Sequence, residues 1–107
     1  MDEPFRRLKS LLEAAGGPRY VVEYASEGQM PHKAPGVLEP LLSAIPAPGG
    51  PAAFRCWAGE HYVLVAAMLP PYRTRLEGVL GWSEAEGVTR IPWKDAPDVL
   101  DGLLSLP

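Results

Sequence analysis

The longest apolar run of the chain, Phe54–Leu69, constrains the fold more than any other stretch. Its second half, Tyr62–Leu69, is continuously apolar and begins with aromatic and β-branched residues, which is typical of a strand buried on both faces. Phe54–Trp57 is the predicted partner strand, because the intervening Gly59 supplies the positive φ that tight hairpin turns need. The sequence therefore predicts a central hairpin. The other elements are expected to pack on its faces or to flank it as edge strands of the sheet.

The two central residues of the predicted turn are either Gly59-Glu60 or Ala58-Gly59. The two turns give strand registers that are shifted by two residues relative to each other. A shift by an even number of residues keeps every side chain on the same face, so both turns predict the same two faces. One predicted face carries Phe54, Cys56, His61, Val63 and Val65, and the other carries Arg55, Trp57, Tyr62 and Leu64.

Three elements are predicted before the central hairpin. Apolar residues at helical spacing indicate a first helix, which Gly16-Gly17-Pro18 ends. Arg19–Ala25 has the composition of a strand. Val37–Ile45 is apolar enough for a short second helix, which begins near Glu39 or Pro40 because proline is not tolerated deep inside a helix.

After the hairpin, the chain shows a second pair of strands and a last helix. Arg75–Trp82 and Val88–Trp93 are predicted to pair through the four-residue loop Glu84–Gly87, since a five-residue loop would place Arg90 on the apolar face. A final helix is predicted from Asp95, which has the side chain of an N-cap residue.

The predicted element order is α-β-α-β-β-β-β-α. Hairpins without regular βαβ spacing favour an α+β fold, here an antiparallel or mixed sheet of about five strands with helices packed on it. A chain of 107 residues corresponds to one domain that is large enough for its own core. We therefore expect a single compact domain over residues 1–107.

Charge and composition narrow the classes of partner. The net charge is −3 and no long run of either sign occurs, which disfavours binding to nucleic acid or to an anionic membrane. The N-terminal residues lack the apolar core of a secretory signal, and no apolar stretch is long enough to span a bilayer. A single cysteine excludes an intramolecular disulfide and a cysteine-rich zinc site. We expect a cytoplasmic protein with no metal and no cofactor.

Cys56 and His61 are the first candidate pair for chemistry. They share a predicted face, and with Ala58-Gly59 as the turn they lie directly opposite each other. A thiolate beside an imidazolium is a known nucleophile arrangement. The rest of that face is apolar, however, and burial raises the pKa of a thiol. We therefore favour the interpretation that Cys56 is a small core residue.

Two further groups are weaker candidates. His32 lies in the long predicted loop Ser26–Gly36, where it has no neighbouring metal-ligand spacing and is interpreted as an exposed loop residue. Arg73, Arg75 and Arg90 concentrate positive charge in the C-terminal half, and arginine forks bind phosphates and carboxylates. In the predicted second hairpin, Arg75 and Arg90 both point away from the tryptophans, so they could meet. We favour the alternative interpretation, in which these arginines lie on a solvated sheet edge with Glu77 as a neighbour.

These observations favour a small non-catalytic binding or interaction domain. With 47% hydrophobic residues, the chain has more apolar side chains than a small monomer hides easily, so we expect it to form a homodimer and to bind protein partners. The alternative function is a small ligand-binding protein or enzyme. Its site would lie near the hairpin tips, at the Cys56–His61 pair or at the arginine cluster.

The composition also predicts a thermally robust protein. The chain has no asparagine, one glutamine and 13 prolines, and the prolines lie mostly between elements, which is a thermophile pattern. We expect unfolding above the range of roughly 45–65 °C that is usual for mesophile domains. A calorimetric melt measures this, and a midpoint inside that range would contradict the prediction.

Overall fold

The computed structural model describes residues 2–24, 38–46, 49–85 and 87–106. Within these residues, six strands form one antiparallel sheet in the order β1-β2-β3-β4-β6-β5. The strands are β1 (Tyr20–Tyr24), β2 (Leu38–Pro46), β3 (Phe54–Gly59), β4 (Tyr62–Ala67), β5 (Trp82–Ser83) and β6 (Val88–Pro92). The helices are α1 (Asp2–Gly16), α2 (Pro70–Glu77) and α3 (Ala96–Leu104), with a 3₁₀ turn, Gly17–Arg19, after α1. The α+β prediction is confirmed, with an antiparallel sheet that has one strand more than expected.

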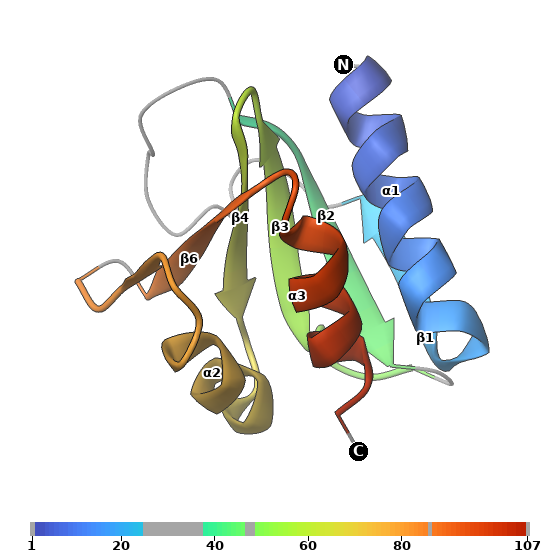
Figure 1. Ribbon diagram of the computed structural model, residues 1–107. Coiled ribbons are helices and arrows are strands. Elements are labelled where there is room, and N and C mark those ends of the chain that lie inside the picture. The colour runs from blue at the N-terminus through green and yellow to red at the C-terminus, as the bar shows by residue number, and fades with distance from the viewer. Residues whose placement is uncertain (1, 25–37, 47–48, 86, 107) are drawn as a thin grey trace.

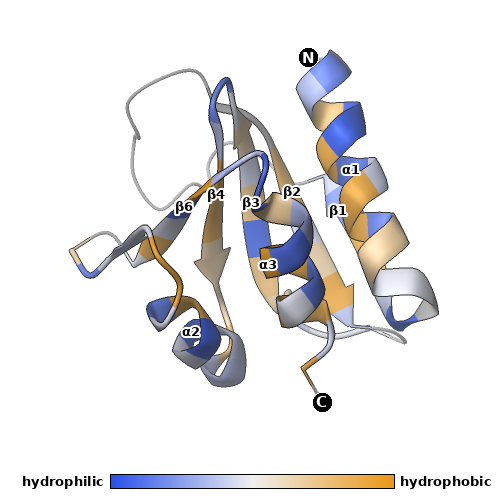
Figure 2. Ribbon diagram, viewed as in Figure 1, coloured by the Kyte–Doolittle hydropathy of each residue, from blue (hydrophilic) through white to orange (hydrophobic). Residues whose placement is uncertain are grey.

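Helices α1 and α3 lie side by side on one face of the sheet (Figure 1). In α1 the predicted apolar stripe points inward, since Leu8 and Leu12 are fully buried while Glu13 is exposed. Figure 2 shows the same division, with apolar residues on the side of α1 that faces the sheet. The helix ends at Gly16, and Gly17 has a φ of +56°, as predicted for a glycine stop.

The predicted central hairpin is present as β3 and β4, but its turn residues are Glu60 and His61. Ala58 pairs with Val63, so both predicted turns are wrong. Gly59 is not among the glycines with positive φ, and the turn therefore does not use the glycine conformation on which the prediction rested. The observed register is shifted from both predicted registers by an even number of residues. Each side chain of the two strands therefore stays on its predicted face.

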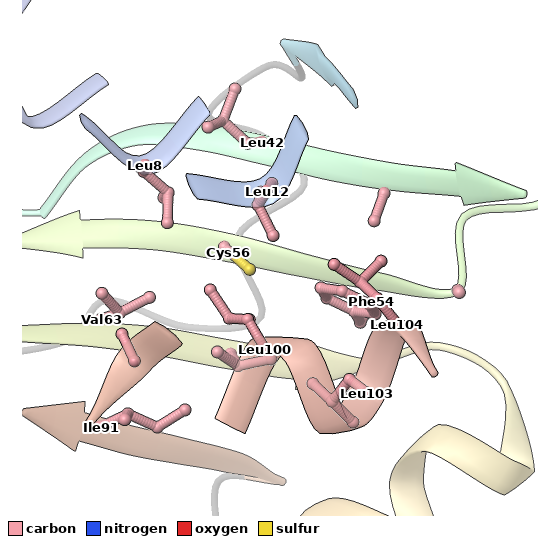
Figure 3. Packing of buried hydrophobic residues seen from close by; sticks show 14 of the residues in the cluster. Leu8, Leu12, Leu42, Phe54, Cys56, Val63, Ile91, Leu100, Leu103 and Leu104 are labelled. Carbon is pink, nitrogen blue, oxygen red and sulfur yellow. The ribbon is translucent and has the colours of Figure 1, made fainter. Parts of the chain in front are cut away.

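The two faces of this hairpin belong to two apolar clusters. The first cluster lies between the sheet and the helices and takes in Phe54, Cys56, Val63 and Val65 together with Leu8, Leu12 and the leucines of α3 (Figure 3). The second cluster lies on the opposite face and consists of Leu41, Trp57, Leu64, Ala66 and Val88, with Tyr62 packed against it. None of the second-cluster residues belongs to a described helix. Both faces of the hairpin are buried, as its continuous apolar pattern predicts.

The short helix predicted over Val37–Ile45 is wrong, because this segment is strand β2. β2 pairs with β1 on one side and with β3 on the other, so Leu41–Ala44 are buried in the middle of the sheet. A short, uniformly apolar run fits a buried strand and a buried helix equally well. Pro40 lies where the register between β2 and β3 shifts, between Leu38 and Leu41, so its missing amide does not interrupt a regular ladder.

The strand predicted over Arg75–Trp82 is also wrong. Pro70 and Pro71 occupy the first positions of helix α2, where proline is tolerated because those amides have no partner within the helix. Strand β5 is limited to Trp82 and Ser83, but its pairing with β6 confirms the predicted four-residue loop. The element order is therefore α-β-β-β-β-α-β-β-α.

A matched pair of leucine variants measures the contribution of the first cluster. Leu12 is a residue of α1 whose side chain is fully buried against the sheet, whereas Leu80 is 94% exposed. We expect Leu12→Ala to lower the free energy of unfolding by about 2–5 kcal/mol, through lost burial and the remaining cavity. Leu80→Ala should change it by less than about 0.5 kcal/mol. Urea unfolding of both variants decides this, and equal losses would contradict the described packing.

Candidate functional site

Cys56 lies in the centre of the first cluster. Figure 3 shows its sulfur between Leu12 of α1 and Leu100 of α3, and the residue is fully buried. Burial raises the pKa of the Cys56 thiol, because the thiolate would be out of contact with water. The thiol is therefore protonated at neutral pH and is poorly suited to act as a nucleophile.

His61 lies in the hairpin turn and does not approach Cys56. Its side chain is exposed, and its Nε2 is 3.8 Å from Oε1 of Glu60. In the observed register Cys56 pairs with Val65, so His61 is beyond the end of the ladder. The predicted pairing of these two residues depended on a turn that the chain does not form, and the nucleophile arrangement is not assembled.

The three arginines are not brought together either. Arg73 on α2 has its Nε 3.5 Å from Oε2 of Glu77, and its guanidinium lies 5.2 Å from the centre of the Trp82 ring. Arg75, also on α2, packs against Gly102 of α3.

Arg90 lies on the other side of the sheet. It pairs with Leu64 of the second cluster, and its guanidinium is 5.9 Å from the centre of the Tyr62 ring. Arg75 and Arg90 do not meet, because Arg75 is on a helix above the first cluster and not on a strand beside β6.

A buried tyrosine pair is a feature that the sequence did not reveal. The hydroxyls of Tyr20 on β1 and Tyr72 on α2 are 2.5 Å apart, although the residues are 52 positions apart. Burial and, to a smaller extent, the hydrogen bond with Tyr72 raise the pKa of Tyr20 to about 12. Tyr20 is therefore neutral at physiological pH, and its hydrogen bond with Tyr72 joins β1 to α2. Neither residue carries a local pattern that could have indicated the contact.

The turn between α2 and β5 presents one leucine to solvent. Leu80 is 94% exposed, the largest exposure of any large apolar side chain in the described residues. Next to it, Gly81 has a φ of +99°, and a Cβ at this position would lie 2.4 Å from the carbonyl oxygen of Arg90. The amide of Arg90 donates to the carbonyl of Gly81 at 3.1 Å. Only glycine fits this close approach, which holds the turn against β6 and leaves Leu80 at its tip.

A hollow of about 470 Å³ opens beside this leucine, between the turn, β6 and the start of α3. We call it the Leu80 hollow. It is bordered by Val79, Leu80, Gly81, Arg90, Ile91, Pro92, Asp95 and Val99, so most of its border is apolar. Leu80 and the hollow together form a concave surface whose border is mostly apolar. The sequence did not indicate this surface, because in the predicted strand over Arg75–Trp82 the side chain of Leu80 shares the apolar face of the second hairpin with Ile91.

Comparison of the chain with protein-family models, with curated proteins and with solved structures found no match. In the part of the chain that the structure describes, no group of three or more His, Cys, Asp or Glu side chains is placed to hold a metal ion. The described helices are also too short or too polar to cross a membrane. His32 lies outside the described residues.

The burial of Cys56 predicts its reactivity. Maleimide labelling of the native protein should be much slower than labelling of the urea-unfolded protein, because the sulfur lies between two helices. Time-resolved mass spectrometry measures both rates on the same chain, in which Cys56 is the single cysteine. Rapid native labelling with a pH dependence centred below about 8.5 would contradict the prediction, since that behaviour requires an exposed and activated thiol.

Proposed function

We propose that the protein is a small, non-catalytic interaction domain of the cytoplasm that binds other protein chains and associates with itself. The observation that carries the proposal is the position of Leu80, which is 94% exposed at the edge of an apolar hollow. In this position the side chain is in water and adds nothing to the core. Its burial against a partner would contribute roughly 1.5–3 kcal/mol to binding.

The Leu80 hollow fits one anchoring side chain of a partner chain better than a polar substrate. Its border includes the apolar side chains of Val79, Ile91, Pro92 and Val99, and protein interfaces commonly place one apolar or aromatic residue in such a depression. The described residues offer no comparable support for the alternative function, because Cys56 and His61 lie apart and Arg75 and Arg90 lie on opposite sides of the sheet.

A titration with N-acetyl-tryptophanamide tests the hollow directly. The probe carries a neutral aromatic side chain and a capped backbone, and it stands in for the anchoring residue of a partner. We expect its addition at millimolar concentration to shift the methyl resonances of Ile91 and Val99, which border the hollow. The methyl groups of Leu12, buried on the inner side of α1, should not shift.

Two variants sharpen this titration. Leu80→Asp adds a charge at the edge of the hollow and should reduce the shifts at least about fivefold, because an apolar contact is replaced by a carboxylate that has to be desolvated. Ala85→Asp adds the same charge at an exposed loop position away from the hollow and should leave the shifts unchanged. Shifts that are absent in the original protein, or that survive Leu80→Asp, would refute the binding role of the hollow.

A further inference from the structure

Strand β1 forms one edge of the sheet, and its only neighbour among the described strands is β2. The backbone groups on its outer side therefore have no strand partner within the described sheet. Edge strands of this kind form hydrogen bonds with strands of other chains unless the protein protects them. The opposite edge is β5, which has two residues and offers little backbone for pairing.

β1 lacks three of the devices that commonly protect an edge strand, namely a bulge, a proline and a lysine. Its five residues pair with β2 without a bulge, and the sequence YVVEY contains neither proline nor lysine. Val21 is 48% exposed and Tyr24 is 54% exposed, which makes β1 the one described element with two exposed large apolar side chains. Glu23 is the only charged residue of the strand.

We propose that β1 pairs in antiparallel fashion with β1 of a second copy of the chain, about a two-fold axis at Val21, so that one sheet runs through both copies. This inference rests on the self-association that the proposed function includes, and it names the surface responsible. In this register Val21 lies opposite Val21 of the second copy, and Tyr20 lies opposite Val22. β-branched and aromatic pairs of this kind stabilise antiparallel strands.

The charges at the two ends of β1 favour a second copy over an unrelated peptide. Arg19 precedes the strand and is exposed, while Glu23 is exposed near its other end. Both residues are two positions from Val21, so the proposed register brings Arg19 of each copy level with Glu23 of the other. The strand is therefore complementary to itself in charge, as a two-fold interface requires.

Helix α1 adds to the contact area. It runs along the same edge of the molecule (Figure 1), and its Phe5 ring lies 5.9 Å from the ring of Tyr24. The two-fold axis would bring the α1 helices of both copies onto the same face of the joined sheet. A stable dimer buries on the order of 1,200–2,000 Å² in total. Because the proposed register overlaps only Tyr20, Val21 and Val22 of the two strands, the α1 helices would supply much of that area.

Light scattering on a size-exclusion column at low micromolar concentration tests the proposal. The unmodified protein should show twice the 11.6 kDa mass of one chain. Val21→Lys places two like charges opposite each other at the axis and should give the mass of a single chain. The matched variant Val21→Thr keeps a β-branched residue and should keep the dimer. Because Val21 is half exposed, circular dichroism and thermal melting should show that both variants fold.

A charge exchange tests the register. Glu23→Arg places an arginine level with Arg19 of the second copy and should weaken the dimer at least about tenfold. Adding Arg19→Glu to that variant should restore the original dissociation constant. Arg19 also donates a hydrogen bond to the carbonyl of Leu106 at 2.9 Å, but the double variant lacks this bond, so recovery cannot come from it.

The possible outcomes separate this inference from the proposed function. A dimer that survives Val21→Lys but is lost in Leu80→Asp would overturn the β1 interface and assign self-association to the Leu80 hollow. Loss of the dimer in Val21→Lys without recovery in the charge exchange would overturn the two-fold register. A single-chain mass for the unmodified protein would overturn both the interface and self-association, whereas the titration of the Leu80 hollow would still decide binding to other chains.

Discussion

The burial of β3 and β4 on both faces is the constraint on which the rest of the structure depends. Phe54 and Cys56 point toward the helices, whereas Trp57 and Leu64 point to the opposite side. A hairpin with two apolar faces is stable only when both are removed from water, and burial of apolar area is the largest favourable term in folding. Helices α1 and α3 cover the first face, and β2 and β6 extend the sheet so that the hairpin lies at its centre.

That central position determines what the neighbouring segments become. β2 lies between two strands, so Leu41–Ala44 are buried although Pro40 and Pro46 flank them. On the other side, β4 is followed by α2, which lies against the end of the sheet, and the hydroxyl of Tyr72 meets that of Tyr20 there. The tyrosine pair joins the edge strand β1 to α2, and these two elements come from distant parts of the chain.

The two surfaces that we assign to binding lie where this packing ends. β1 is the outermost strand on one side, and the Leu80 hollow lies beside β6 and α3, toward the other side of the sheet. Three strands of the sheet, β2, β3 and β4, separate β1 from β6. A dimer formed through β1 would therefore leave the Leu80 hollow of each copy open to another chain. Self-association and partner binding then become separate properties, which single substitutions can affect one at a time.

The sequence by itself determined the elements whose signals are local. Helical spacing with a glycine stop identified α1, a continuous apolar run identified the β3–β4 hairpin and its faces, and the four-residue loop before Val88 was recognised from the side chains that it places together. The tertiary structure alone decided the rest, because the missing information is non-local. Whether the apolar segment around Leu41 is a strand or a helix depends on the strands beside it. Pro70-Pro71 are compatible both with the end of an extended segment and with the first turn of a helix, and here they begin α2. The same distinction holds for the candidate functional residues. The burial of Cys56 was predicted from the face of the strand on which it lies, whereas the exposure of Leu80 depends on how one turn packs against β6.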